Sequence, residues 1–532
     1  MTIYEHYHMA MVEIANDHIE KIRQGYIFDS ETIDIGVADM GGEAVKDARI
    51  CLPVSMLTRH GLICGATGTG KTITLQLLAE QIAAHGIPVF ATDIKGDLSG
   101  LSKAGVASDK LAARTQSNGQ TWTPEAASVE FFSLSDQSPG IPIRAHLHRF
   151  GPLLLARVLG LNTTQESCLV LIFSYAEKLS KPFVTLDDLA SCLSYLSSDE
   201  GRDDLKSIGG ISTSSLGVII RSLATLQSYG ADRFFGEPSF DVNDLFRTDP
   251  NGRGIISMLE LPSMLDSPTL LSTFVMWTLN ELFSTLPEIG DNGVPRLVFF
   301  FDEAHLLFDK ASPAFLDEVI RTVRLIRSKG VGIFFVTQTA SDIPAEVLAQ
   351  LGSRIQHQMR AHTPADAKAL KATVSTFPRC DYDLEEVLTS LGIGEAIVTV
   401  LNPDGVPTPV AWTRIFAPCS QMGAVSGEEI EQIVRRSPLA SRYESRRGGK
   451  PLTYGITESA HSDSDDGHHF HRAQRNEPSH AKVSSSHSAR RSSREEKSLI
   501  SRVIGSSAFK QFARSAGREL VRSLFPRSKR RR

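Results

Sequence analysis

A lysine and a threonine that follow a run of glycines form the clearest candidate site in the chain. The run fits the pattern G-x-x-x-x-G-K-[ST] at every fixed position, between an apolar stretch and a helical pattern. Glycines at this spacing let successive backbone N–H groups point at phosphate oxygens, and the following helix adds its positive N-terminus. Lys71 would then contact the β- and γ-phosphates of ATP, and the Thr72 hydroxyl would bind Mg²⁺. The residues expected to bind the nucleotide are Gly65, Ala66, Thr67, Gly68, Thr69, Gly70, Lys71, Thr72 and Ile73.

Two adjacent carboxylates at the end of an apolar run form the second candidate site. Residues 297–301 are all apolar and predict a buried central strand, and Asp302 and Glu303 follow where such a strand meets solvent. This arrangement is typical of a Walker B element, in which Asp302 would bind Mg²⁺ and Glu303 would polarise the attacking water. We expect His305 to hydrogen-bond to these groups rather than to act as an acid or a base.

Two further strand ends carry polar residues that could approach the same phosphates. One apolar stretch predicts a strand that ends at Gln338, which could contact both the γ-phosphate and the water, or could simply cap the strand. The stretch 86–98 predicts a strand followed by Asp93, Lys95 and Asp97. Functional groups gather beyond the carboxyl ends of parallel strands, so these three could lie near the phosphates. They could equally form a structural turn.

An α/β fold has to hold these residues. Short apolar runs alternate with helical patterns, which is typical of a mostly parallel sheet covered by helices. A long, mainly helical stretch separates the two chemical sites, and Thr185 begins one of its helices with a capping-box pattern. We therefore divide the chain into an N-terminal helix and β-hairpin (1–57), a P-loop half of the core (58–145), a helical insertion (146–250), a Walker B half (251–420), a disordered linker (421–497) and a basic amphipathic helix (498–532).

Charge is unevenly distributed along the 532 residues. The formal net charge is −5, but residues 501–532 hold ten Lys and Arg against one Glu, which leaves −14 on the rest. We expect the basic end to bind polyanions, either nucleic acid or an acidic membrane surface, although a solubility tail or a helix that docks on a neighbouring subunit fits equally.

The spacing of the cysteines and the length of the apolar runs bear on the location of the protein. The six cysteines form no C-x-x-C pair, so we expect reduced thiols and a cytoplasmic location. The longest apolar run has six residues, so we expect no membrane span.

In combination these motifs resemble the HerA–FtsK class of P-loop motor ATPases, and more closely a bacterial HerA-helicase-like family. The segments that carry the resemblance are Gly65–Thr72, Asp93–Leu98, Phe234–Pro238, Phe301–His305, Arg324–Gly330, Val336–Gln338 and Arg354–Ala361. It implies a RecA-like core, homo-oligomeric rings that we expect to be hexamers, and ATP hydrolysis coupled to movement on DNA. HerA proper also carries an N-terminal β-barrel that docks a nuclease, and the segment before Gly65 is too short for a complete one. A nuclease partner is therefore left open.

The resemblance also implies an arginine that acts on the next subunit of the ring. Such an arginine often supplies the missing transition-state charge in RecA-like sites. Arg327, at the end of the helix that follows the carboxylates, is the candidate, with Arg324 and Arg354 in reserve. Alternatively, the arginines three apart on this helix, Arg321, Arg324 and Arg327, pair with acids such as Glu318 on a solvated face.

Two other functions compete with a DNA motor. The letters at 302–305 suggest a DEAH helicase, but that class needs a second RecA-like domain with an arginine-rich motif, and no such motif follows Asp302. The other alternative is a P-loop ATPase that acts on protein partners, or as a regulatory switch, without a nucleic-acid substrate. The acidity of the chain before residue 501 favours it, because generic DNA affinity comes from Lys and Arg. We expect a DNA translocase or helicase-like motor, with the protein-directed ATPase as the alternative.

Overall fold

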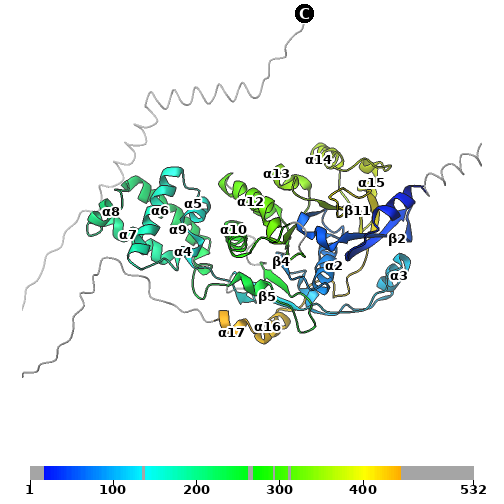
Figure 1. Cartoon of the computed structure of the whole chain (residues 1–532), viewed down its shortest axis with the longest axis horizontal. Coiled ribbons are helices and arrows are strands. Elements are labelled where there is room, and N and C mark those ends of the chain that lie inside the picture. Colours follow the sequence, from blue (N-terminus) through cyan, green and yellow to red (C-terminus); the bar gives the residue numbers. More distant parts are fainter. Residues whose placement is uncertain (1–16, 135–137, 262–267, 291–293, 310–312, 445–532) are drawn as a thin grey trace, which may run out of the picture. The chain divides into compact units, whose positions relative to one another are not determined.

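A 12-stranded mixed sheet organises the part of the chain that the computed structural model describes (Figure 1). The described residues are 17–134, 138–261, 268–290, 294–309 and 313–444. The strands are β1 (Thr32–Met40), β2 (Glu43–Pro53), β3 (Gly61–Cys64), β4 (Val89–Asp93), β5 (Val129–Ser133), β6 (Ile141–Pro142), β7 (Ile256–Glu260), β8 (Leu297–Phe301), β9 (Val331–Thr337), β10 (Ser353–His357), β11 (Glu395–Thr399) and β12 (Ala411–Ile415). Their order across the sheet is β2-β1-β12-β11-β10-β3-β9-β8-β4-β7-β5-β6.

The sheet is parallel from β10 to β6 and antiparallel from β2 to β10. Helices cover both faces of the parallel part, which is why its strands are apolar on both sides. In β8, Phe299 and Phe301 face the core under α10 and α12, whereas Val298 and Phe300 face the core under α2. The helices on the sheet are α2 (Lys71–Ala84), α3 (Asp109–Asn118), α10 (Pro268–Thr285), α11 (His305–Phe308), α12 (Pro313–Ile326), α13 (Ala345–Leu348), α14 (Pro364–Val374) and α15 (Leu384–Ser390). The predicted α/β class with a mostly parallel sheet is confirmed.

Six helices between β6 and β7 form a group of their own beside the sheet (Figure 1). They are α4 (Leu147–Phe150), α5 (Pro152–Val158), α6 (Thr163–Lys178), α7 (Leu186–Ser197), α8 (Arg202–Ser207) and α9 (Thr213–Ser228). The capping box predicted at Thr185 is present at the start of α7. The apolar faces of these helices continue the core under α10, so the insertion is packed on the sheet domain rather than tethered to it.

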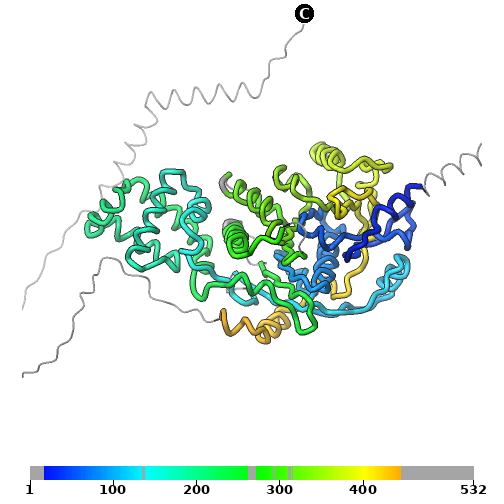
Figure 2. The backbone as a smooth tube through the Cα atoms, in the orientation of Figure 1, coloured from blue at the N-terminus to red at the C-terminus, as the bar shows by residue number. Residues whose placement is uncertain are grey.

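The first and last strands of the described chain lie side by side, as the blue and yellow segments of Figure 2 show. β1 and β2 form the hairpin predicted within residues 1–57, and β1 pairs with β12 in antiparallel register, with Gly36 opposite Ile415. Helical residues 17–25 precede the hairpin, and the Tyr26 hydroxyl after them donates to the carbonyl oxygens of Val398 and Pro409 at 3.1 and 3.0 Å. The N-terminal segment is thus part of the sheet domain.

The prediction that a disordered linker begins at residue 421 is wrong for its first part. The structure forms α16 (Gly427–Arg436) and α17 (Ala440–Tyr443) there, and both pack near β5 and β6. Tyr443 is 1% exposed, its hydroxyl contacts Asp244, and its carbonyl oxygen accepts a hydrogen bond from Arg144 at 3.0 Å. Polar composition concealed these helices, because few apolar residues suffice to bury one face of a short amphipathic helix.

The remainder of the predicted linker and the predicted basic helix 498–532 lie outside the described residues. Among the residues that are described, none of the helices combines the length and the apolar character that a bilayer span requires.

Replacement of Tyr443 by alanine tests whether the segment after β12 is part of the fold. The loss of a buried ring is expected to lower the free energy of unfolding by about 3 kcal/mol. Tyr443→Phe keeps the ring and loses only the hydroxyl contact, so it should cost about 1 kcal/mol. Chemical denaturation of the full chain measures both values. If α17 were a detached linker, neither substitution would change the unfolding midpoint.

Candidate nucleotide-binding site

The predicted phosphate-binding loop joins β3 to α2, and glycines give it its shape. Gly68 and Gly70 have φ angles of 82° and 116°, in the left-handed region where a side chain is strained. Lys71 Nζ lies inside the loop and donates hydrogen bonds to the carbonyl oxygens of Gly65 at 2.8 Å and Ala66 at 3.2 Å. Burial lowers the pKa of Lys71. The nine residues expected to bind nucleotide all lie in this loop and the first turn of α2.

A histidine of β10 braces this loop from the neighbouring strand. His357 Nδ1 donates to the carbonyl oxygen of Glu395 at 2.8 Å, which leaves Nε2 to accept the Thr74 hydroxyl at 2.9 Å. Burial lowers the pKa of His357 to about 4, so the imidazole stays neutral in this role. A Cβ at Gly65 would lie 2.5 Å from the Cβ of His357, and this position therefore needs glycine. No local pattern predicts the brace, because Thr74 and His357 are 283 positions apart.

Asp302 lies just beyond β8 with one oxygen that nothing satisfies. Its side-chain Oδ2 is buried and has no hydrogen-bond partner in the described part of the chain, while its backbone N–H donates to Thr92 Oγ1 at 3.0 Å. Burial, and next the charge of Glu303, raise the pKa of Asp302 to about 7. A buried acceptor without a donor is suited to a cation. Its carboxylate and the Thr72 hydroxyl are oxygen ligands of the kind that Mg²⁺ prefers.

These two residues would leave most of the ligands of Mg²⁺ to come from water and phosphate. Among the described residues, no group of three or more His, Cys, Asp or Glu side chains could hold a metal ion. A dedicated protein cage is not expected for Mg²⁺, which keeps several waters and binds through one or two carboxylates and the phosphates of its substrate. The residues present therefore fit Mg²⁺ bound together with a nucleotide.

Glu303 combines an uncommon backbone conformation with an ion pair. Its φ angle is 46°, which is uncommon for a residue with a side chain. The carboxylate is 5% exposed, and its Oε1 forms an ion pair with Lys95, whose side chain is 44% exposed. Oε2 lies 3.2 Å from His305 Nδ1, within ion-pair distance but without hydrogen-bond geometry. The hydrogen bond expected from His305 is therefore not formed, and Lys95 is the main partner of Glu303.

The polar residues after β4 have separate tasks. Asp93 accepts hydrogen bonds from the backbone N–H groups of Gly96 at 2.7 Å and Leu98 at 2.9 Å, so it forms the structural turn that we considered as an alternative. Burial raises the pKa of Asp93 to about 6. The turn carries Lys95 to Glu303, whereas Asp97 Oδ1 is buried without a hydrogen-bond partner in the described residues. Lys95 is thus the member of this group that contacts Glu303 directly, whereas the charge of Asp97 contributes to the raised pKa of Asp302.

The other predicted catalytic residues lie at opposite ends of β9. Gln338 follows the strand directly and is exposed at the edge where β3 leads into the P-loop. Arg327 precedes the seven-residue strand, whose length is about 23 Å. Arg327 therefore cannot reach the P-loop of its own chain. Its charge contributes to the low pKa of His60, after the larger effect of burial.

The reserve arginines have contacts or exposure of their own. Arg354 donates to the carbonyl oxygen of Thr376 at 3.3 Å and lies over the ring of Phe377, whereas Arg324 is exposed on α12. Glu318 pairs with Arg321 at 2.5 Å, as the alternative expects for the arginines three apart on this helix, and it also contacts Arg157 of the insertion.

Two features beside the P-loop were not predicted. Arg360 Nη2 donates to the carbonyl oxygen of Thr67 at 3.3 Å, which places an exposed cation on the loop. A pocket of about 360 Å³ opens next to Gly70 and Ile73, between α3 and the chain around β11 and β12. The helix α3, which forms one wall of this pocket, was not among the elements that we predicted, although Ser108 caps it by accepting the N–H of Leu111.

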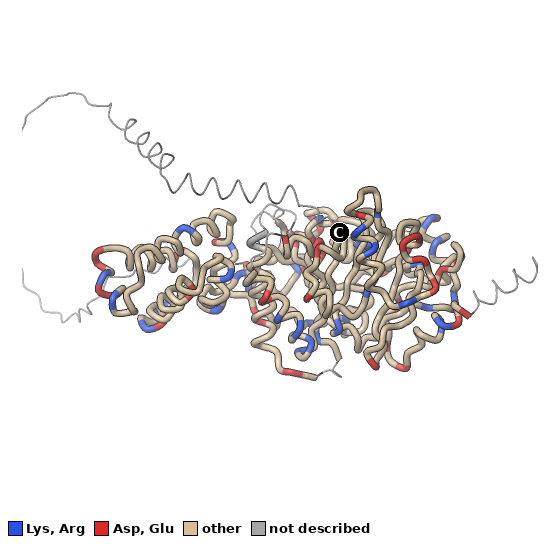
Figure 3. Tube along the Cα trace, turned by 90° about the horizontal axis from the view of Figure 1, so that it is seen from above, with Lys and Arg blue, Asp and Glu red and all other residues tan. Residues whose placement is uncertain are grey.

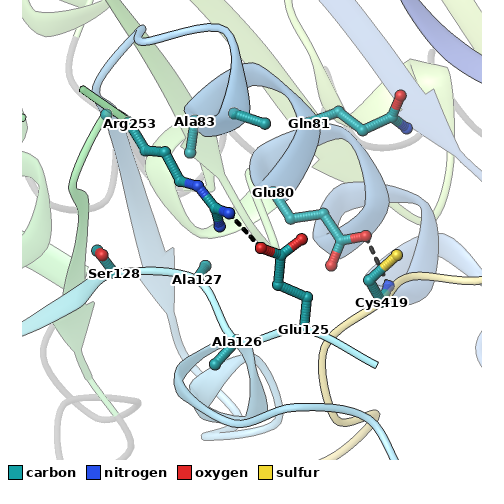
Figure 4. A pocket seen from close by; sticks show the side chains of 11 residues that line it. Glu80, Gln81, Ala83, Glu125, Ala126, Ala127, Ser128, Arg253 and Cys419 are labelled. Carbon is teal, nitrogen blue, oxygen red and sulfur yellow. Dashed lines mark hydrogen bonds and ion pairs between the residues drawn. The ribbon is translucent and has the colours of Figure 1, made fainter. Parts of the chain in front are cut away.

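A smaller pocket, of about 100 Å³, lies at the last turns of α2 (Figure 4). Glu80 accepts hydrogen bonds from the Cys419 N–H and the Ser420 hydroxyl, both at 2.7 Å. Arg253 and Glu125 form an ion pair among the residues that line it. These contacts tie the chain that leaves β12 to α2, and no predicted site residue lines the pocket. We therefore interpret this region as a structural contact between α2 and the chain after β12, rather than as a binding site.

Replacement of Lys95 by alanine tests the ion pair with Glu303. A fully buried pair broken on one side costs 3–5 kcal/mol, but exposure of Lys95 reduces the expected loss in unfolding free energy to about 1 kcal/mol. In a Glu303→Gln background the same substitution should cost much less, because no buried charge then lacks its partner. Chemical denaturation of the four proteins of this double-mutant cycle measures the difference. Equal losses in both backgrounds would contradict the pair.

Comparison with known proteins agrees with this architecture. The family model described as Helicase HerA-like C-terminal matches residues 40–532. The DNA double-strand break repair helicase HerA of Saccharolobus solfataricus is 22% identical over 372 residues, which are 68% of this chain and 66% of that protein. The chain thus spans just under two thirds of the length of this relative.

Solved structures show the same fold at low identity. The plasmid coupling protein TrwB in complex with ADP and Mg²⁺ is 15% identical and has a TM-score of 0.50 over 77% of this chain and 93% of that chain. VirB4 of Thermoanaerobacter pseudethanolicus is 14% identical over 74% of this chain and 98% of that chain, with a TM-score of 0.45. The family match covers more than half of the sequence and includes the P-loop and both carboxylates. The chain belongs to the Helicase HerA-like C-terminal family, within the HerA–FtsK class of P-loop ATPases.

Proposed function

We propose that this protein binds ATP and Mg²⁺ at the candidate site, hydrolyses ATP, and works as a homo-oligomeric ring on DNA. The proposal rests chiefly on Asp302, whose buried Oδ2 lacks a partner among the described residues at the sheet edge that also holds the P-loop. A carboxylate in that position is costly to bury unless a cation satisfies it. Beside a P-loop, the cation that fits is Mg²⁺ carried by a nucleotide.

The side chains of the site divide the reaction between them. Lys71 would exchange the carbonyl oxygens of Gly65 and Ala66 for phosphate oxygens, which need its charge more. Glu303 would accept the proton of the attacking water, and Gln338 would orient that water. Mg²⁺ supplies neutralising charge on the phosphates when bound. Lys95 holds Oε1 of Glu303, whereas Oε2 has no hydrogen-bond partner among the described residues and could accept the proton.

DNA as the substrate and a ring as the assembly are supported by the family. The family description names a helicase, and the archaeal relative is named as a DNA repair helicase. We propose a hexamer, because Arg327 cannot serve its own site and a closed ring would present it to the next one. Figure 3 shows Lys and Arg interspersed with Asp and Glu along the described trace. Contact with DNA would therefore be confined to the ring interior rather than spread over a basic face.

Measurement of Mg²⁺-dependent ATP hydrolysis, with and without duplex DNA, tests the function. Lys71→Ala should weaken nucleotide binding by about 10- to 100-fold, since a charged hydrogen bond is worth about 1.5–3 kcal/mol. Glu303→Gln should keep binding but lower kcat by about 10²–10⁴, because the amide cannot accept a proton. Near wild-type turnover by Glu303→Gln would refute its assignment as the catalytic base.

The same assay separates the two possible substrates. A DNA motor should hydrolyse ATP several-fold faster when duplex DNA is added, and the stimulation should fall steeply with salt concentration. Hydrolysis that DNA leaves unchanged at every salt concentration would favour the protein-directed ATPase instead.

Mixed rings test whether Arg327 acts on the neighbouring subunit. Arg327→Ala and Lys71→Ala should each be nearly inactive alone, because a trans-acting arginine is worth about 10³–10⁵ in turnover. Co-assembly should restore part of the activity, since some interfaces then pair an intact P-loop with an intact arginine. Arg435→Ala, at an exposed arginine of α16 that has no place in the proposed site, is the matched control and should retain activity. Full activity of Arg327→Ala alone, or no recovery in verified mixed rings, would contradict the role.

A further inference from the structure

The pocket beside the P-loop begins where the phosphate cradle ends. Gly70 and Ile73, which flank Lys71 and Thr72, contribute to its lining. The backbone N–H of Gly394 donates to the carbonyl oxygen of Thr69 at 3.0 Å, so the turn before β11 is attached directly to the loop. With phosphates in the cradle, the rest of a nucleotide would extend into this pocket. Its volume of about 360 Å³ is within the usual range for small-ligand sites, about 300–1,000 Å³.

Hydrogen bonds within the protein already occupy the backbone of one wall. The N–H groups of Ile415, Phe416 and Ala417 donate to Gly394 O, Ile35 O and Gln120 Oε1 at 2.9, 3.0 and 2.9 Å. These bonds leave none of the three donors available to a ligand.

Three carbonyl oxygens of the same wall, those of Gly394, Ile415 and Ala417, are engaged as well. Arg114 Nη2 donates to Gly394 O at 2.8 Å and to Ile415 O at 3.1 Å, and Gln120 Nε2 donates to Ala417 O at 2.7 Å. Nη2 of the Arg114 guanidinium is thus used to hold the wall together, as is the side-chain amide of Gln120, which does not itself line the pocket.

Apolar side chains form the rest of the contact surface. Leu111 of α3 is 7% exposed, whereas Ile393 and Met422 are 76% and 47% exposed. Large apolar side chains left open at a pocket are suited to cover the faces of a flat ring. The other polar side chains of the lining, Ser108 and Lys110, lie on the exposed start of α3, and Ser108 already caps that helix.

We propose that this pocket holds the base of the bound nucleoside triphosphate by shape and apolar contact, without reading its hydrogen-bonding edge. The proposal rests on the proposed nucleotide binding and extends it to the substrate class: purine nucleoside triphosphates, both adenine and guanine. A site that hydrogen-bonds a substrate group rejects the analogue without it by about 10⁴–10⁵, whereas an apolar pocket discriminates by about 10² at most. The two purines have similar shapes, so the expected ratio of kcat/KM for ATP and GTP is within about tenfold.

Competition binding and turnover on the full-length protein test the proposal. We expect Ile393→Ser and Met422→Ser to weaken ATP and GTP equally, by about 3- to 10-fold each, and to leave the binding of inorganic tripolyphosphate unchanged. Both side chains are exposed, so the variants should fold. Val406→Ser is the matched control, because Val406 is 56% exposed and does not line the pocket. It should change none of the three affinities.

The outcomes separate this proposal from the function on which it rests. A preference for ATP over GTP above about 100-fold, or variants that weaken one purine nucleotide and not the other, would overturn the proposal while ATP hydrolysis stands. Variants with unchanged affinity for both nucleotides would show that the base lies elsewhere. Wild-type protein that binds neither nucleotide nor tripolyphosphate would refute the proposed function itself.

Discussion

The parallel pairing of one short strand determines the geometry of the whole site. β3 has only four residues, all buried, and its backbone pairs with β10 on one side and β9 on the other. Because the register is fixed on both edges, the P-loop emerges at the edge where β9 and β8 also end. A slip of one residue would turn the side chains of β3 to the opposite faces of the sheet. The phosphate-binding loop, the two carboxylates and Gln338 are therefore brought together by strand pairing rather than by contacts among themselves.

Burial gives the charged groups at that edge their properties. Lys71, Asp302 and Glu303 are each less than a tenth exposed, where charges are costly unless they are paired. The structure meets this cost with carbonyl oxygens for Lys71 and with Lys95 for Glu303, and leaves one oxygen of Asp302 unsatisfied. The carbonyl oxygens around Lys71 and the unsatisfied oxygen of Asp302 are the two arrangements that the proposed triphosphate and its Mg²⁺ would improve.

Segments remote from the P-loop complete the surroundings of the site. The antiparallel half of the sheet joins the N-terminal hairpin to β12, and the turn before β11 attaches to the P-loop through Gly394 and Thr69. α3, which lies between β4 and β5 in the chain, supplies the opposite wall of the adjoining pocket. The proposed phosphate-binding loop is therefore one continuous segment, whereas the proposed base pocket is lined from four segments, 70–73, 108–114, 393–394 and 415–422, that only the folded sheet brings together.

The sequence by itself determined the P-loop, the carboxylates after β8, the α/β class and the capping box at Thr185. These features are local, because glycine spacing, apolar runs and capping residues act within a few positions of the chain. The helices after residue 426 were missed even though Ser426 and Glu429 form a capping box, because polar composition outweighed that local signal.

Only the tertiary structure decided which distant groups would meet. Lys95 and Glu303 are 208 positions apart, and Thr74 and His357 are 283 apart, so strand order and register alone bring them into contact. Sequence patterns describe what each strand end carries, but not which ends become neighbours. That choice is made by the pairing of buried strands, whose side chains and hydrogen bonds have to be satisfied across the whole sheet at once.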